Sequence, residues 1–111
     1  MTVVIGRFAP SPTGPLHFGS VVSAVASFLD VRAQGGRWLL RIDDLDPPRI
    51  EAGAAQRILI TLEALALQWD GAVVYQSARN EAYAQALAQL TAHGQVYVCH
   101  CSRKEIGRAH V

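Results

Sequence analysis

The stretch RFAPSPTGPLHFGS, residues 7–20, most constrains what this chain can fold into. It places three prolines and two glycines directly after the apolar, β-branched residues 2–8, which predict a strand covered on both faces. Apolar residues then recur with helical spacing over residues 18–34, and Gly35-Gly36 predicts the end of that helix. A strand, a rigid loop and the start of a helix are therefore expected in this order.

The rest of the chain continues the alternation of strands and helices. We predict strands over residues 37–43 and 73–75, helices over 51–68 and 80–93, and a short extended piece over 96–98. In the second of the helices, Ile58, Leu59, Leu62, Leu65 and Ala66 share one face. This order predicts an α/β fold, a Rossmann-like parallel sheet with helical crossovers, and we expect Trp38 and Trp69 in its core.

Composition excludes several classes of protein. Half of the 111 residues are apolar, 17% are charged and the net charge is +1, which is unlike a disordered chain or a basic nucleic-acid-binding tail. No apolar run reaches the length needed to cross a bilayer, and the N-terminus lacks the pattern of a secretory signal. We therefore expect a soluble, cytoplasmic monomer with no membrane partner.

The carboxyl ends of the first two predicted strands hold the candidate site, because open parallel sheets bind ligands at that edge. Ser11, Thr13 and Gly14 offer hydroxyl and amide donors in the first loop. His17 brings an imidazole to the first turn of a helix, where free amides and the helix dipole favour an anion such as phosphate. Gly19 would let a flat group such as an adenine ring approach the backbone. The P-loop and GxGxxG patterns are absent from the sequence.

The sequence blocks as a set resemble the glutamyl branch of the class I aminoacyl-tRNA synthetases. These blocks cover about residues 3–105 and are RFAPSPTGPLHFGS, RIDDLDPPR, WDG, YQS and YVCHCSRKEI. The resemblance implies a ligase that activates L-glutamate with ATP and Mg²⁺ and transfers it to a tRNA. GPLHFGS and the double proline Pro47-Pro48 are most similar to members that activate glutamate without tRNA and attach it to queuosine in tRNA(Asp). Attachment to tRNA(Glu) is the alternative.

The resemblance also implies roles for individual residues. Glutamate would be bound by Arg7, Phe8, Ala9, Pro10, Ser11 and Asp43. ATP would be held by Pro10, Ser11, Pro12, Thr13, Gly14, His17, Gly19 and Ser20, with His17 and Gly19 in the catalytic role. Asp43 is one methylene shorter than the glutamate usual in the family. We expect the neighbouring Asp44 and Asp46 to be solvated loop acids, Asp46 also marking a helix start, and Arg41 and Arg49 to be surface or ion-pair residues.

Cys99 and Cys101 are a weak metal indication by themselves, because a structural zinc site needs four ligands. The resemblance implies that they are the first half of a Zn²⁺ site, in an insertion that starts near residues 97–105; a reduced pair without metal is the alternative. Residues 1–105 would then be the N-terminal part of a catalytic domain and residues 106–111 a non-native tail. We expect such a fragment to be inactive alone.

Two other classes of function share some of these features. Another His-x-Gly-His nucleotidyltransferase would use the same ATP motif without needing Arg7 and Asp43 for an amino acid. A non-enzymatic zinc-binding or nucleotide-binding module would need only part of the site.

Overall fold

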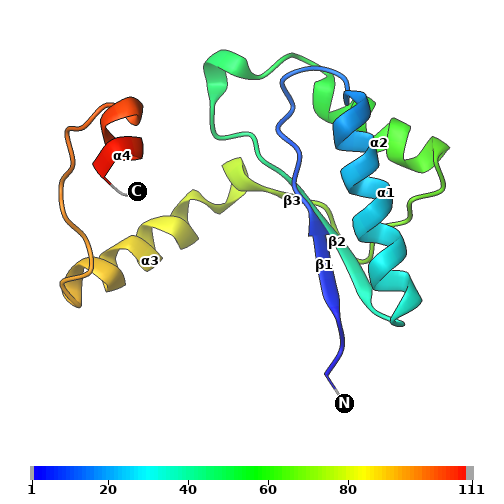
Figure 1. Ribbon diagram of the computed structural model, residues 1–111, viewed down its shortest axis with the longest axis horizontal. Coiled ribbons are helices and arrows are strands. Elements are labelled where there is room, and N and C mark those ends of the chain that lie inside the picture. Colours follow the sequence, from blue (N-terminus) through cyan, green and yellow to red (C-terminus); the bar gives the residue numbers. More distant parts are fainter. Residues whose placement is uncertain (1, 110–111) are drawn as a thin grey trace. The chain divides into compact units, whose positions relative to one another are not determined.

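The computed structural model describes residues 2–109, which divide into two units at the boundary between Arg79 and Asn80. The first unit contains β1 (Ile5–Phe8), α1 (Phe18–Ala33), β2 (Arg37–Ile42), the 3₁₀ turn η1 (Pro47–Arg49), α2 (Ala54–Ala64), β3 (Val74–Tyr75) and η2 (Gln76–Arg79). The second contains α3 (Asn80–Ala92) and α4 (Arg103–Ala109). Figure 1 labels these helices and strands.

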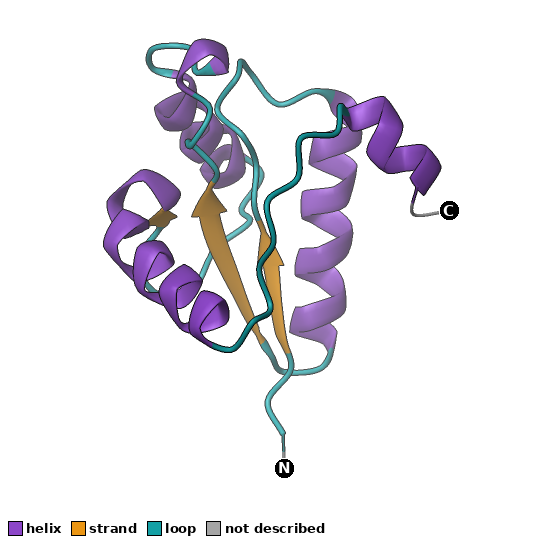
Figure 2. Cartoon of the chain, turned by 90° about the vertical axis from the view of Figure 1, so that its left-hand side faces the viewer, coloured by secondary structure: helices purple, strands orange, loops and turns teal. Residues whose placement is uncertain are grey.

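The three strands form a parallel sheet in the order β1-β2-β3. Ile5 pairs with Arg37 and Phe8 with Leu40, so the first two strands run side by side over the whole of β1, as Figure 2 shows. The third strand is short and meets β2 only near its end, where Ile42 pairs with Tyr75. The predicted α/β fold with helical crossovers is therefore confirmed.

The core of the first unit lies between the sheet and the helices α1 and α2, which Figure 1 draws on the same side of the strands. Alternate residues of β2 point into it, and Trp38 is completely buried. The Trp38 ring stacks on Phe8 with 6.1 Å between centroids, and its Nε1 donates to Ser27 Oγ at 3.0 Å. From α2, Ile58 and Leu62 fill the same cluster. This packing fixes the carboxyl end of β1 beside the N-terminus of α1.

Gly6 allows α1 to lie close to the sheet. A Cβ at Gly6 would overlap the side chain of Val31 on α1. A Cβ at Gly36, in the turn between α1 and β2, would likewise overlap the carbonyl of Val4. These two close approaches need glycine, because a larger residue at Gly6 would push α1 away from β1, and one at Gly36 would push the turn away from Val4.

Asp70 ties the chain after α2 to the start of β2. Its Oδ2 accepts hydrogen bonds from Arg32 Nη1 at 2.6 Å and from the Trp38 amide at 2.8 Å. The Asp70 amide in turn donates to the Trp38 carbonyl at 2.8 Å. The hydrogen bond from Arg32 and that from the Trp38 amide hold the pKa of Asp70 below its ordinary value.

Two predictions about elements of the first unit are wrong. The first strand begins at Ile5, and its residues alternate between exposed (Ile5, Arg7) and less exposed (Gly6, Phe8); Ile5 is 58% exposed, so β1 is not covered on both faces. The second helix covers Ala54–Ala64 rather than residues 51–68. Gly53 and Ala66 have positive φ angles of 78° and 58°, which take the chain out of helical geometry at either end. Leu65 accordingly lies outside the helix and is 46% exposed.

In the second unit, α3 follows the prediction closely but the extended piece does not form. Residues 96–98 have no regular structure, and Tyr97 and Val98 are 76% and 80% exposed. The helix α4 was not predicted; its first turn is closed by Ser102 and Glu105, whose side chains exchange hydrogen bonds with each other's amides. It includes residues 106–109 of the predicted tail, while residues 110–111 lie outside the described part. Over residues 2–109, no helix is long and apolar enough to cross a membrane.

Candidate functional site

A hollow of about 310 Å³ opens where β1 ends and α1 begins. It is formed mainly by the proline-rich loop between these two elements. Eight residues predicted from the sequence line it: Phe8, Ala9, Pro10, Ser11, Thr13, Gly14, His17 and Ser20. The structure therefore brings most of the candidate ATP and glutamate residues to one place, while Arg7, Pro12, Gly19 and Asp43 do not line the hollow itself.

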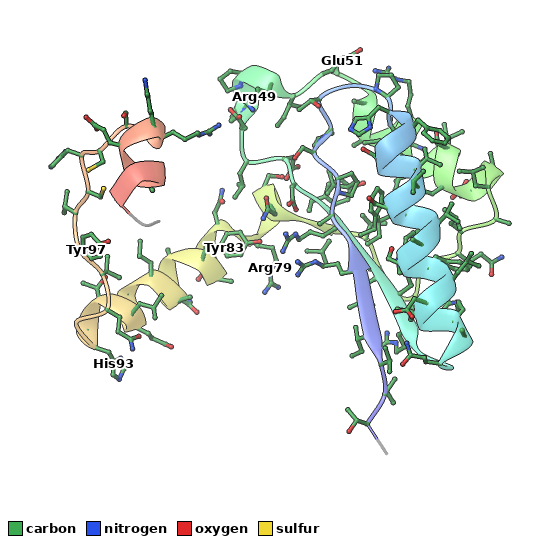
Figure 3. All side chains as sticks on the ribbon, viewed as in Figure 1. Arg49, Glu51, Arg79, Tyr83, His93 and Tyr97 are labelled. Carbon is green, nitrogen blue, oxygen red and sulfur yellow. The ribbon has the colours of Figure 1, made fainter. Side chains whose placement is uncertain are left out.

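Backbone hydrogen bonds hold the wall of this hollow in place. The Asp43 amide donates to the Pro10 carbonyl at 2.9 Å, and the Glu51 amide donates to the Pro12 carbonyl at 3.0 Å. Pro12 is itself fully buried between these contacts. Glu51, labelled in Figure 3, lies on the segment between η1 and α2, so the loop after β2 supports the loop after β1 at two points.

His17 is exposed and caps the N-terminus of α1. Its Nδ1 accepts a hydrogen bond from the Ser20 amide at 3.1 Å, and its Nε2 lies 3.0 Å from Ser20 Oγ. The ring thus satisfies one of the amides that a helix leaves free in its first turn. A buried core histidine, the structural alternative to a ligand-binding one, is excluded by the exposure of the ring.

Gly19 lies directly beneath that ring. A Cβ at Gly19 would be 3.1 Å from His17 Cε1 and 3.2 Å from Nδ1, which is tighter than ordinary van der Waals contact. The sequence argument assigned the space beside Gly19 to an adenine ring; in the structure the His17 imidazole also lies close to this position. Any larger residue at position 19 would therefore push the His17 ring outward by a few tenths of an ångström.

Arg7 and Asp43 come from neighbouring strands. Arg7 is exposed on β1 and pairs with Leu39 in the sheet register. Asp43 follows β2 directly, and its two carboxylate oxygens accept from Arg41 Nε at 2.6 Å and Arg41 Nη2 at 3.1 Å. The expectation that Arg41 forms an ion pair is confirmed, and its partner is the predicted substrate-binding acid. Arg49 also forms an ion pair, with Asp46 at 3.2 Å.

Asp44 is not the solvated loop acid that we expected. Its Oδ1 accepts from the Ser77 amide at 2.8 Å, and its Oδ2 accepts from the Ser77 hydroxyl at 2.6 Å. Partial burial by itself would raise the pKa of Asp44, but these two hydrogen bonds outweigh it and lower the pKa below the ordinary value. Asp44 thus joins the segment after β2 to η2. Asp46, as expected, precedes a helical turn, but its side chain makes no capping hydrogen bond there.

Cys99 and Cys101 are exposed, unbridged thiols in the segment before α4. Among residues 2–109, no three or more His, Cys, Asp or Glu side chains are grouped so that they could hold a metal ion. Two thiols alone do not fit a structural zinc site, which takes four ligands.

Comparison with known proteins gives the family. Residues 3–110 match the family described as tRNA synthetases class I (E and Q), catalytic domain. The chain belongs to this family of class I tRNA synthetases. The hollow at the end of β1 and the parallel sheet are thus parts of a class I synthetase catalytic domain.

Individual relatives of this synthetase chain agree with that assignment. It is 63% identical over 101 residues to the glutamyl-Q tRNA(Asp) synthetase of Dechloromonas aromatica, a match that covers 91% of the chain and 34% of that protein. The protein of the same name from Thiobacillus denitrificans is 62% identical over 105 residues, covering 95% of the chain and 35% of the relative. The chain therefore spans about a third of the length of these curated relatives.

A solved structure shares the fold. A crystal structure of a glutamate tRNA ligase from Elizabethkingia meningosepticum, in complex with its amino acid, superposes with a TM-score of 0.83 and 32% sequence identity. The match covers 97% of this chain and 23% of that protein.

Proposed function

We propose that this chain is the part of a glutamate-activating ligase that binds ATP and L-glutamate, and that the whole protein attaches glutamate to queuosine in tRNA(Asp). The observation that carries the proposal is the identity of about 60% to two proteins named glutamyl-Q tRNA(Asp) synthetase, in matches that cover 91% and 95% of this chain. Attachment to tRNA(Glu) is the second candidate, supported by the glutamate tRNA ligase that shares the fold. With tRNA as the proposed partner, we expect the protein to act in the cytoplasm; we also propose that it is a monomer.

The first step is the formation of glutamyl-adenylate. An oxygen of the substrate α-carboxylate attacks the α-phosphorus of ATP, the bond to the β-phosphate oxygen breaks, and pyrophosphate leaves. No covalent enzyme nucleophile is required, so this chain contributes orientation and charge stabilisation. His17 suits this task because it is exposed at the rim of the hollow, beside the free amides of α1. Mg²⁺ would accompany the triphosphate.

Recognition of glutamate is assigned to Arg7 and Asp43. The Arg7 guanidinium suits a substrate carboxylate. Asp43 suits the substrate ammonium group, because a carboxylate offers about four lone-pair sites and Arg41 occupies only two of them. The same Arg41 contact fixes the direction of the short Asp43 side chain. The Asp43 amide also supports Pro10 in the loop, which links the two halves of the proposed site.

Exchange of labelled pyrophosphate into ATP tests the activation step. The assay uses the protein encoded by the complete reading frame, with glutamate and without tRNA, and residues 1–111 alone in parallel. We expect glutamate-dependent exchange by the whole protein and little from residues 1–111. His17→Ala should lower the exchange rate by about 10²-fold or more, as loss of a transition-state donor does. Exchange that depends on a phospho-alcohol or pantetheine phosphate instead of glutamate would favour another nucleotidyltransferase.

The acceptor is tested with labelled glutamate and purified tRNA. Queuosine-containing tRNA(Asp) should be labelled, while tRNA(Asp) lacking queuosine and tRNA(Glu) should not. Labelling of tRNA(Glu) alone would transfer the proposal to the second candidate.

We propose zinc binding only by Cys99 and Cys101, which would supply two thiolate ligands; the zinc ion would need two more ligands. Metal analysis of the purified whole protein, beside a Cys99→Ser variant, tests this role. We expect one zinc per wild-type protein and less in the variant. Equal zinc contents in the two proteins would remove Cys99 from the ligand set.

A further inference from the structure

The contact between Asp44 and Ser77 extends the pairing of β2 and β3 beyond the end of the sheet. Ile42 pairs with Tyr75 in the parallel register. Two residues further along each segment, Asp44 Oδ1 accepts from the Ser77 amide at 2.8 Å, and Oδ2 accepts from the Ser77 hydroxyl at 2.6 Å. The Asp44–Ser77 contact thus joins two of the sequence blocks, RIDDLDPPR and YQS, and no step of the proposed reaction uses it.

The Asp44–Ser77 contact acts where the sheet itself holds the chain weakly. The third strand has two residues, Val74–Tyr75, and η2 follows it and ends at Arg79, labelled in Figure 3. Partial burial would raise the pKa of Asp44, but the hydrogen bonds from Ser77 outweigh it and lower the pKa, so the carboxylate is charged at neutral pH. Hydrogen bonds to a charged acceptor are about twice as strong as those between neutral groups. The contact therefore fixes the chain after β2 relative to η2.

Asp43, the residue proposed to bind the substrate ammonium group, lies directly beside this contact in the chain. Its amide donates to the Pro10 carbonyl at 2.9 Å, and its carboxylate accepts from Arg41. The next residue, Asp44, is held by Ser77. The backbone of Asp43 is thus supported both by the loop after β1 and by η2. Because Asp43 has one rotatable bond fewer than a glutamate, its carboxylate has less freedom to correct a displaced backbone.

We infer that Ser77 is a positioning residue for glutamate recognition: through Asp44, it holds the backbone of Asp43 where the short carboxylate reaches the substrate ammonium group. Ser77 itself touches no substrate in this arrangement. The role in glutamate recognition rests on the proposed function, whereas the coupling of Ser77 to the Asp43 backbone does not. A longer acid at position 43 would depend less on Ser77, because its additional bond can compensate for a shift of the backbone.

Amide hydrogen exchange in residues 1–111 tests the coupling without any substrate. Ser77→Ala removes the hydroxyl and keeps the amide, and exchange at the Asp43 amide should become faster by about 3- to 10-fold, the range set by one net hydrogen bond. The Trp38 amide, which donates to Asp70, is the internal reference and should not change. Ser27→Ala is the matched control: it removes the acceptor of Trp38 Nε1, so any loss of stability should speed both amides alike. An unchanged Asp43 rate in Ser77→Ala would overturn the coupling.

Pyrophosphate exchange by the whole protein tests the role in recognition. Ser77→Ala should raise KM for glutamate by about 3- to 10-fold and leave kcat unchanged, the pattern of a lost contribution to binding. KM for ATP should change by less than about 2-fold, because neither Asp44 nor Ser77 lines the hollow. Ser77→Thr keeps the amide and the hydroxyl and should restore the wild-type KM for glutamate. A merely structural role would lower the amount of active protein, so a lower apparent kcat with both KM values unchanged would overturn the inference.

Asp43→Glu tests the dependence on the short side chain. In this background the longer acid can recover its position, so Ser77→Ala should raise KM for glutamate by a smaller factor than in wild type. The same factor in both backgrounds would overturn the link through the Asp43 backbone. If the wild-type whole protein shows no glutamate-dependent exchange, the proposed function and the recognition role fail together. Wild-type exchange with an unchanged KM for glutamate in Ser77→Ala would overturn the recognition role alone.

Discussion

Substitution of Gly19 by alanine tests the folded-back position of His17 directly. The new Cβ would lie 3.1 Å from His17 Cε1, so the ring must move outward by a few tenths of an ångström. The hydrogen bond from the Ser20 amide to Nδ1 is already 3.1 Å long. Because N–H···N and N–H···O bonds weaken beyond about 3.2 Å, this movement should break the helix cap.

Two opposing terms set the size of the effect. Alanine in place of glycine stabilises a helical position by up to about 1 kcal/mol. Loss of an N-terminal cap costs about 0.5–2 kcal/mol, typically ~1. The free energy of unfolding of Gly19→Ala should therefore differ from wild type by less than about 1 kcal/mol. In a His17→Ala background no ring opposes the Cβ, so the same substitution should be stabilising by its full helical term.

Urea unfolding, followed by the fluorescence of the buried Trp38, measures all four proteins of this double-mutant cycle. The expected coupling between the two positions is about 1 kcal/mol, within the ~0.5–3 kcal/mol found for residues in contact. Equal stabilisation by Gly19→Ala in both backgrounds would refute the argument, since the ring would then not sense the Cβ.

Three further predictions concern the scaffold of the site. Asp70→Asn should make the free energy of unfolding depend less on pH in acid. The lowered pKa of Asp70 contributes stability that is fully present above the ordinary value of 3.8 and is lost as the pH falls through the pKa of the folded state. Unfolding titrations at a series of acidic pH values measure this dependence. Asp44→Ala should cost about 1 kcal/mol and speed hydrogen exchange at the Ser77 amide, which loses its acceptor; unchanged exchange there would contradict the described contact. Ile58→Ala should lower the free energy of unfolding by about 2–5 kcal/mol in urea, whereas exposed Ile60→Ala, the matched control, should change it by less than about 0.5 kcal/mol.

The sequence was sufficient for the order of elements and for most of the hollow, because both follow from local patterns. Glycine pairs, prolines and apolar spacing act over a few residues, and α1 and α3 accordingly lie within a residue or two of their predicted bounds. Burial depends on tertiary packing. The apolar run of residues 2–8 therefore misled, since its continuity does not tell whether a second layer covers the strand.

Hydrogen bonds between distant segments were the part that the sequence did not reveal. The Asp44–Ser77 contact joins residues 33 apart, and a serine after a short strand gives no indication of its partner. The Asp43 and Glu51 amides that support the loop after β1 carry no side-chain pattern at all. The Arg41–Asp43 pair differs, because residues two apart in extended backbone share a face, so alternation continued one residue past β2 could have predicted it.

Gly19 illustrates a more general limit on arguments from motifs. A glycine in the first turn of a helix shows that something must approach the backbone closely, but a ligand and a neighbouring side chain make the same demand. Here a neighbouring side chain does make that demand, because the His17 ring lies 3.1 Å from where a Cβ of residue 19 would be. If ATP binds as proposed, it meets a histidine already oriented by the helix that it caps. The cost of orienting that ring is then met during folding rather than at binding, which is the physical advantage of placing a histidine, a glycine and a serine within one turn.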